Sequence, residues 1–116
     1  FFNKYLFKQI EKHLDKKYDI ARIYFNGQWP GRDGAFHKDD NGNAKMSVLF
    51  YVGEYKLGWG GFTEILTSPT EQKVIAPLQN RLVIFPGGDL MHKGYSFSHQ
   101  SCPMRVSLAY KLYGSS

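Results

Sequence analysis

The feature that most constrains this chain is a series of short β-prone runs separated by turn residues, which starts near Asp19 and continues to the C-terminal end. Turn signals such as Asn26-Gly27 and Pro86-Gly87-Gly88 recur about every 8–12 residues, which is typical of an antiparallel sandwich or barrel. A βαβ fold would need helical segments between the strands. The predicted strands cover residues 20–25, 35–37, 46–52, 62–66, 73–77, 81–85, 90–97 and 105–113.

The first residues follow a different pattern, which predicts one amphipathic helix. Two sets recur at intervals of four, one apolar and one basic: Phe2, Leu6, Ile10 and Leu14, and Lys4, Lys8, Lys12 and Lys16. Their offset of two residues is about 200° on a helix, so the two stripes lie on opposite faces. We expect a mainly β double-stranded β-helix, or jelly roll, with a helix over about 1–18 packed on one sheet and a barrel over about 19–113. The whole chain, 1–116, is predicted to be one domain.

Composition narrows the class of partner. The formal net charge of +5 raises the question of nucleic acid, but much of it belongs to the lysine stripe, which we interpret as the solvated face of the helix. Nucleic acid is therefore not the expected partner, although the sequence leaves it open. No apolar run approaches the roughly 20 residues of a membrane helix, and the single Cys102 forbids an intrachain disulfide. We expect a cytoplasmic protein without a membrane partner. The chain begins at Phe1, which leaves open whether an upstream segment is missing.

An imidazole and a carboxylate stand two residues apart in His37-Lys38-Asp39. In an extended segment, residues i and i+2 point to the same face, so both side chains can reach one metal ion. A second histidine from a distant strand would complete two histidines and one carboxylate. That set leaves three positions for a bidentate 2-oxoacid and dioxygen at non-haem Fe(II). The motif alone arises by chance, so a solvent-exposed pair stays an alternative.

A distal histidine and a late arginine strengthen this interpretation. His92 follows the tight turn at 86–89 and stands thirteen residues before Arg105, enough for a strand to end, turn and return antiparallel. An inward Arg105 is costly without an anion, and its fork matches a carboxylate bidentately. An outward Arg105 is the alternative. Three other candidates are not expected to bind metal: His13 on the helix, His99 in a polar turn, and Asp40, which would face away from His37.

In this order and spacing the motifs resemble the prolyl-4-hydroxylase-like branch of the 2-oxoglutarate/Fe(II) oxygenases, including its compact bacterial and phage members. The resemblance runs from Tyr24 to Leu112. The segments that carry it are His37-Lys38-Asp39, Leu49-Phe50-Tyr51, Trp59-Gly60-Gly61, Asn80-Arg81-Leu82-Val83-Ile84-Phe85, His92 and Arg105. Two departures are the short chain and an arginine where collagen-type enzymes have lysine.

The resemblance implies roles for named residues. His37, Asp39 and His92 would form the catalytic Fe(II) site, and Arg105 would bind the 2-oxoglutarate carboxylate. Three further cosubstrate contacts are implied at Tyr51, Ser107 and Tyr24, of which Tyr24 could equally be an aromatic of the core. The implied small molecules are Fe(II), 2-oxoglutarate as cosubstrate, dioxygen and, optionally, ascorbate.

The implied reaction is oxidative decarboxylation of 2-oxoglutarate to succinate and carbon dioxide, coupled to hydroxylation of a substrate C–H bond. A prolyl residue of a protein or peptide is the substrate that the resemblance suggests. Two alternatives stay open. One is a nucleic-acid demethylating oxygenase with the same iron site, and the other is a metal-binding jelly-roll module without turnover.

Overall fold

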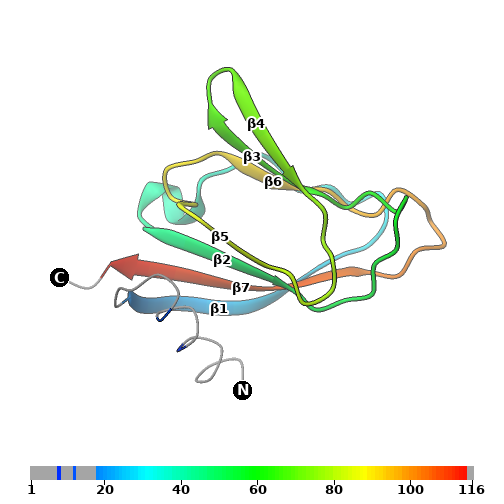
Figure 1. The fold of residues 1–116 in the computed structure, drawn as a ribbon, viewed down its shortest axis with the longest axis horizontal. Coiled ribbons are helices and arrows are strands. Elements are labelled where there is room, and N and C mark those ends of the chain that lie inside the picture. Colours follow the sequence, from blue (N-terminus) through cyan, green and yellow to red (C-terminus); the bar gives the residue numbers. More distant parts are fainter. Residues whose placement is uncertain (1–7, 9–11, 13–17, 115–116) are drawn as a thin grey trace.

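Two antiparallel sheets face each other in the computed structural model, which describes residues 8, 12 and 18–114 (Figure 1). Within these residues the elements are β1 (Tyr18–Gln28), η2 (a 3-10 helix, Asp39–Gly42), β2 (Met46–Tyr51), β3 (Thr63–Ser68), β4 (Glu71–Ile75), β5 (Leu82–Phe85), β6 (His92–Gly94) and β7 (Arg105–Gly114). The larger sheet has the order β1-β7-β2-β5 and the smaller one β4-β3-β6. Apart from the hairpin of β3 and β4, neighbouring strands are distant in sequence, as expected for a jelly roll, so the predicted mainly β fold is confirmed.

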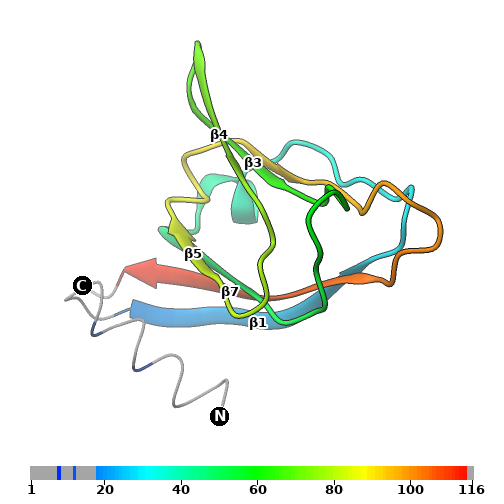
Figure 2. The same cartoon turned by 45° about the vertical axis from the view of Figure 1, so that its right-hand side comes forward.

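The smaller sheet lies over the larger one, and the hairpin of β3 and β4 projects away from the barrel (Figures 1 and 2). In the larger sheet β7 pairs with both β1 and β2. Its register places Ala109 between Tyr24 of β1 and Leu49 of β2, and Ser107 between Asn26 and Tyr51. The last strand of the chain is therefore a central strand, and its inner side chains face the smaller sheet.

The two-residue period of β7 separates a core face from a cavity face. Leu108, Tyr110 and Leu112 form an apolar cluster with Val48 of β2. The cluster is extended by partly buried side chains at Ile23, Met46, Phe50, Val52, Leu82 and Ile84. The alternate residues of β7, which are Arg105, Ser107, Ala109 and Lys111, line a cavity inside the barrel. The alternation thus gives β7 one apolar face and one face that lines the cavity.

Two predicted strands are shorter than expected. Residues 35–37 form an isolated bridge, His37 with His92, and the chain then turns into η2. The turn has positive φ at Asp40 (48°) and Gly42 (91°), which extended backbone does not allow. The strand expected over 90–97 is confined to β6. Its partner β3 pairs with it only from Thr63 to Ile65.

The predicted N-terminal helix falls on residues that lie outside the described ones, apart from Lys8 and Lys12. In the part of the chain that the structure describes, no helix has the length and apolar character needed to cross a membrane.

The apolar cluster yields a prediction about stability. Leu108 is 1% exposed, so Leu108→Ala should leave a cavity and lower the free energy of unfolding by roughly 2–5 kcal/mol. Leu57 is 87% exposed, and Leu57→Ala should change it by less than about 0.5 kcal/mol. Urea denaturation measures both values. Equal effects of the two substitutions would contradict the assigned core.

Candidate metal centre and cosubstrate cavity

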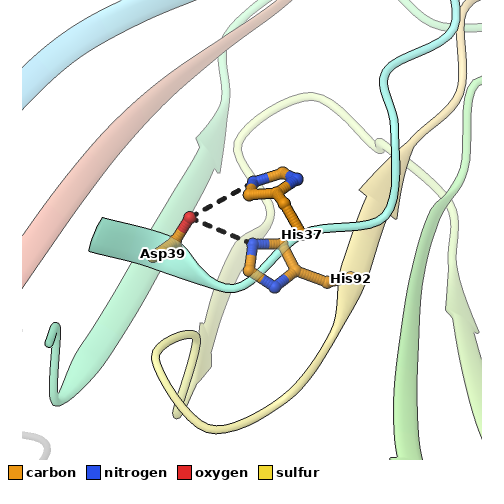
Figure 3. Close-up of side chains that lie close together, drawn as sticks. All are labelled: His37, Asp39 and His92. Atoms are coloured by element: carbon orange, nitrogen blue, oxygen red, sulfur yellow. Dashed lines mark hydrogen bonds and ion pairs between the residues drawn. The ribbon is translucent and has the colours of Figure 1, made fainter. Parts of the chain in front are cut away.

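Three side chains meet where the start of η2 abuts β6 (Figure 3). Nε2 of His37 lies 3.3 Å from Oδ1 of Asp39, and Nε2 of His92 lies 3.2 Å from the same oxygen. Each of the three residues offers one candidate ligand atom, and these three atoms all lie within 4.8 Å of one another. The structure thus brings together all three residues that the sequence predicts as metal ligands.

The backbone fixes this meeting point. His37 and His92 exchange two backbone hydrogen bonds, each 3.0 Å from nitrogen to oxygen, so segments more than fifty residues apart in sequence are held in register. Lys38 between the two ligands is extended (φ −106°, ψ 141°), which directs His37 and Asp39 to the same side. The expected extended geometry therefore holds at Lys38, although Asp39 already begins the 3-10 helix.

Both imidazoles are oriented by main-chain carbonyls. Nδ1 of His37 lies 2.8 Å from the Ala35 oxygen, and Nδ1 of His92 lies 2.8 Å from the Leu90 oxygen. A carbonyl only accepts hydrogen bonds, so each Nδ1 is the donor. In a neutral ring Nε2 then keeps its lone pair, and both Nε2 atoms face Asp39. Two imidazole nitrogens and one carboxylate oxygen form the donor set that non-haem Fe(II) prefers, so the residues fit the metal.

Asp39 is held as an anion inside the protein. It is 3% exposed, its amide N–H donates to the Gly87 oxygen over 2.8 Å, and its Oδ2 accepts hydrogen bonds from Ser47 Oγ and from Lys111 Nζ, the latter at 2.6 Å. Burial raises the pKa of Asp39, but the contact with His92 and the hydrogen bonds from Lys111 and Ser47 outweigh it and keep that pKa well below its usual 3.8. Asp39 is therefore ionised at neutral pH.

Arg105 points into the barrel, as predicted, and is 3% exposed. Its Nε donates to the Gly61 oxygen (2.7 Å), one terminal nitrogen to Gln28 Oε1 (2.8 Å) and the other to Thr63 Oγ1 (2.9 Å). These acceptors are all neutral. Within the described residues no carboxylate lies within 4.0 Å of the guanidinium. The buried charge of Arg105 therefore lacks an anion supplied by this part of the protein.

A cavity of about 230 Å³ joins the two ends of the site. His37 and His92 line one part of it, and Ser107 and Ala109 of β7 form a wall that leads to Arg105. The lining also contains two more cations, Arg32 and Lys111, and no carboxylate among the described residues that line it. A cavity with this charge favours a small anion.

The other predicted cosubstrate residues are placed as follows. Ser107 is 1% exposed and lines the cavity. Tyr24 also lines it, at 36% exposure, and so is not a core aromatic. Tyr51 points inward but lies behind the lining, with its hydroxyl 2.6 Å from Thr63 Oγ1 and its ring 5.4 Å from the Arg105 guanidinium carbon.

The residues that we expected not to bind metal are outside the group of ligands. The Asp40 carboxylate pairs with Arg22 (2.6 Å) and accepts a hydrogen bond from the Tyr113 hydroxyl (2.8 Å). His99 is exposed and does not line the cavity, and His13 lies outside the described residues. Cys102 is a buried free cysteine.

The residues that hold Arg105, among them Gln28 and Thr63, were not predicted, and neither were Ser47 and Lys111 at the metal end. The register of β2 with β7 places Ser47 and Lys111 opposite each other, so both reach the same carboxylate oxygen. Alternate residues of β7 point inward, and this series of Arg105, Ser107 and Ala109 continues to Lys111. The two-residue period could therefore have identified Lys111 from the sequence.

Comparison with known proteins agrees with this geometry. Residues 1–112 match the family described as the 2OG-Fe(II) oxygenase superfamily. The chain belongs to this superfamily. Membership implies Fe(II) and 2-oxoglutarate, and the resemblance stated from the sequence is confirmed. No curated protein sequence matches the chain.

Three solved structures show the same fold. A Pseudomonas putida prolyl-4-hydroxylase superposes with a TM-score of 0.74 at 20% identity, over 96% of this chain and 61% of that chain. A prolyl hydroxylase from Trichoplax adhaerens, in complex with a hypoxia inducible factor peptide fragment, gives 0.72 at 17% over 96% and 56%. A Burkholderia pseudomallei member of the 2OG-Fe(II) oxygenase family gives 0.69 at 22% over 84% and 46%. The superfamily member described here thus spans less than two thirds of each of these relatives.

The ligand set yields a prediction about metal binding. His37→Ala, Asp39→Ala and His92→Ala should each abolish binding of Fe(II), because each removes one of only three protein ligands. His99→Ala is the control, since this exposed histidine should leave the affinity unchanged. Calorimetric titration under anaerobic conditions measures the affinity, with circular dichroism to verify folding. Wild-type affinity in His92→Ala would overturn the assignment.

A second prediction concerns Gly87, which lies against the carboxylate. A Cβ at this position would collide with Ser47 Oγ and with Oδ2 of Asp39. Gly87→Ala should therefore move a ligand and weaken metal binding about 10–100-fold in a folded protein. Gly53→Ala is the matched control, because its Cβ would meet Val106 at an ordinary contact of 3.4 Å. Equal metal affinities for the two variants would contradict the tight packing around Asp39.

Proposed function

We propose that this protein is a 2-oxoglutarate-dependent dioxygenase that hydroxylates a C–H bond of a prolyl residue in a protein or peptide. The observation that carries the proposal is one cavity with two chemically different ends. The ligand set His37, Asp39 and His92 is at one end, and Arg105, a buried cation with neutral partners, is at the other. A 2-oxoacid with a second carboxylate matches both.

In this proposal His37, Asp39 and His92 hold Fe(II). The bound iron supplies the activation of dioxygen and of the 2-oxoacid, and the protein supplies orientation and a cavity that excludes water. The carbonyls of Ala35 and Leu90 fix the rings so that Nε2 is the coordinating atom. The burial of Asp39 and His92 keeps this side of the site away from solvent.

Arg105 is proposed to bind the distal carboxylate of 2-oxoglutarate. A guanidinium has five N–H donors, and the three hydrogen bonds to Gly61, Gln28 and Thr63 occupy three of them. Two donors are left for a carboxylate, which is the number that a bidentate pair needs. Ser107 next to it on the cavity wall is a further donor for the same carboxylate.

Tyr51 is proposed to act on Arg105 rather than only on the cosubstrate. Its hydroxyl and one terminal nitrogen of Arg105 share Thr63 Oγ1, and its ring lies beside the guanidinium. Burial raises the pKa of Tyr51, so the hydroxyl is neutral and able to donate. Tyr24, which lines the cavity and is partly exposed, is proposed to contact the other end of the cosubstrate.

The choice of a prolyl substrate is supported by the neighbours in fold. Two of the three solved structures are named as prolyl hydroxylases, and one of them is described as a complex with a peptide fragment. By this analogy the partner is a protein or peptide. A cytoplasmic location, a single domain over 1–116 and the use of ascorbate remain predictions.

The function is tested by following succinate release from 2-oxoglutarate with Fe(II) and dioxygen. We expect release to be stimulated by proline-containing peptides and hydroxylated peptide to appear in the mass spectrum. Stimulation by a methylated oligonucleotide instead would favour a demethylating oxygenase. Metal and 2-oxoglutarate binding with no succinate under any condition would leave a binding module without turnover.

The cosubstrate end yields a quantitative prediction. Arg105→Ala should weaken 2-oxoglutarate binding by roughly 2–5 kcal/mol, which is about 30- to several thousand-fold, because a carboxylate loses its buried partner. Arg105→Lys should lose less, since it keeps the charge and loses only the fork. Tyr51→Phe should weaken 2-oxoglutarate binding by about 1–3 kcal/mol, because one hydrogen bond to a charged group is lost.

The measurement is titration of 2-oxoglutarate at saturating metal, with metal affinity determined separately. Arg22→Ala is the matched control, because this arginine pairs with Asp40 at the surface and does not line the cavity. If Arg105→Ala binds 2-oxoglutarate as tightly as the wild type, the cosubstrate does not occupy this cavity in the proposed orientation.

A further inference from the structure

Lys111 is a buried lysine to which the proposed function gives no role. It is 3% exposed, lines the cavity, and places Nζ 2.6 Å from Oδ2 of Asp39 and 5.7 Å from the centre of the Tyr24 ring. A buried ammonium is costly unless an anion is paired with it. Within the described residues, Asp39 is the one carboxylate that pairs with Lys111. The lysine is therefore committed to a metal ligand.

The two oxygens of Asp39 have separate partners. Oδ1 lies near both imidazole Nε2 atoms, at 3.3 Å from His37 and 3.2 Å from His92. Oδ2 receives Ser47 Oγ and Lys111 Nζ from the larger sheet. The carboxylate thus has one oxygen on the side of the ligands and one oxygen occupied by donors.

This division affects how a metal would be bound. A carboxylate ligand can bind a metal ion through one oxygen or through both. Binding through both would occupy one of the three positions that a 2-oxoacid and dioxygen require. Oδ2 receives a charge-assisted hydrogen bond from Lys111 and a second hydrogen bond from Ser47. A metal ion could bind Oδ2 only by displacing these donors, so Oδ2 is a poor second ligand.

We propose that Lys111 is a positioning residue that holds Oδ2 of Asp39, so that Asp39 binds the metal through Oδ1 alone and three coordination positions stay open. This inference rests on the proposed function, because it assigns the metal to the same three residues. It adds a residue that keeps the site open for the cosubstrate, whereas Arg105 holds the cosubstrate at its far end.

The test uses Mn(II), whose bound water molecules are counted by their effect on proton relaxation of the solvent. With three protein ligands an octahedral Mn(II) keeps three waters, and with both oxygens of Asp39 bound it keeps two. We expect three waters in the wild type. Lys111→Met should lose about one third of the inner-sphere relaxation and bind 2-oxoglutarate about 10–100-fold more weakly in the Mn(II)-loaded protein.

Lys38→Met is the matched control. It removes the same charge one residue from Asp39, but its side chain is exposed and makes no contact with the carboxylate among the interactions of the described residues. Relaxation and 2-oxoglutarate affinity should both stay at wild-type values. A loss in Lys38→Met equal to that in Lys111→Met would show a general effect of charge and would overturn the positioning role.

Two further results would also overturn it. One is three Mn(II)-bound waters in folded Lys111→Met. The other is two Mn(II)-bound waters in the wild type, and this second result tests the proposal even if the variant does not fold. A wild type that fails to bind Mn(II) would instead contradict the proposed function itself. The failure of the lysine's role and the failure of the metal site are thus distinguishable.

Discussion

The pairing of β7 with both β1 and β2 is the constraint on which the rest of the site depends. Because β7 is a central strand, both of its faces are used: its core face carries apolar residues such as Leu108, and its cavity face is enclosed by the barrel. Any polar side chain on the cavity face must then find a partner inside. Arg105 and Lys111 are such side chains. Arg105 donates to Gln28 and Thr63, which line the cavity, and Lys111 pairs with Asp39.

Much of this could be predicted because it depends on local periodicity. The alternation along β7 and the extended Lys38 fix which side chains share a face, and both were readable in the sequence. The contact of Ser47 with Asp39 could not be derived in this way, because it depends on the register of β2 against β7, about sixty residues later in the chain. The partner of Lys111 could not be derived either: the alternation along β7 indicates that Lys111 points inward, but not that it pairs with Asp39.

The 3-10 helix at Asp39 shows a different limit of sequence analysis. The residues before it are compatible with a strand, but the turn needs positive φ at Asp40 and Gly42, and a strand cannot include it. What holds the segment is the reciprocal pair of backbone hydrogen bonds between His37 and His92. This pair is a tertiary interaction between distant segments, and no local propensity encodes it. The metal ligands are thus positioned by one long-range bridge and one sharp turn.

The distribution of buried charge explains why the cavity is suited to a dianion. Among the described residues Asp39 is the one buried carboxylate, and it lies at the end with the two histidines, already paired with Lys111. Arg105, at the other end, is surrounded by neutral acceptors only. A carboxylate of the protein beside Arg105 would pair with the guanidinium and would repel an anionic cosubstrate. Because the buried anion lies at the metal end, the far end is left without a protein anion among the described residues, as the proposed binding of a carboxylate to Arg105 requires.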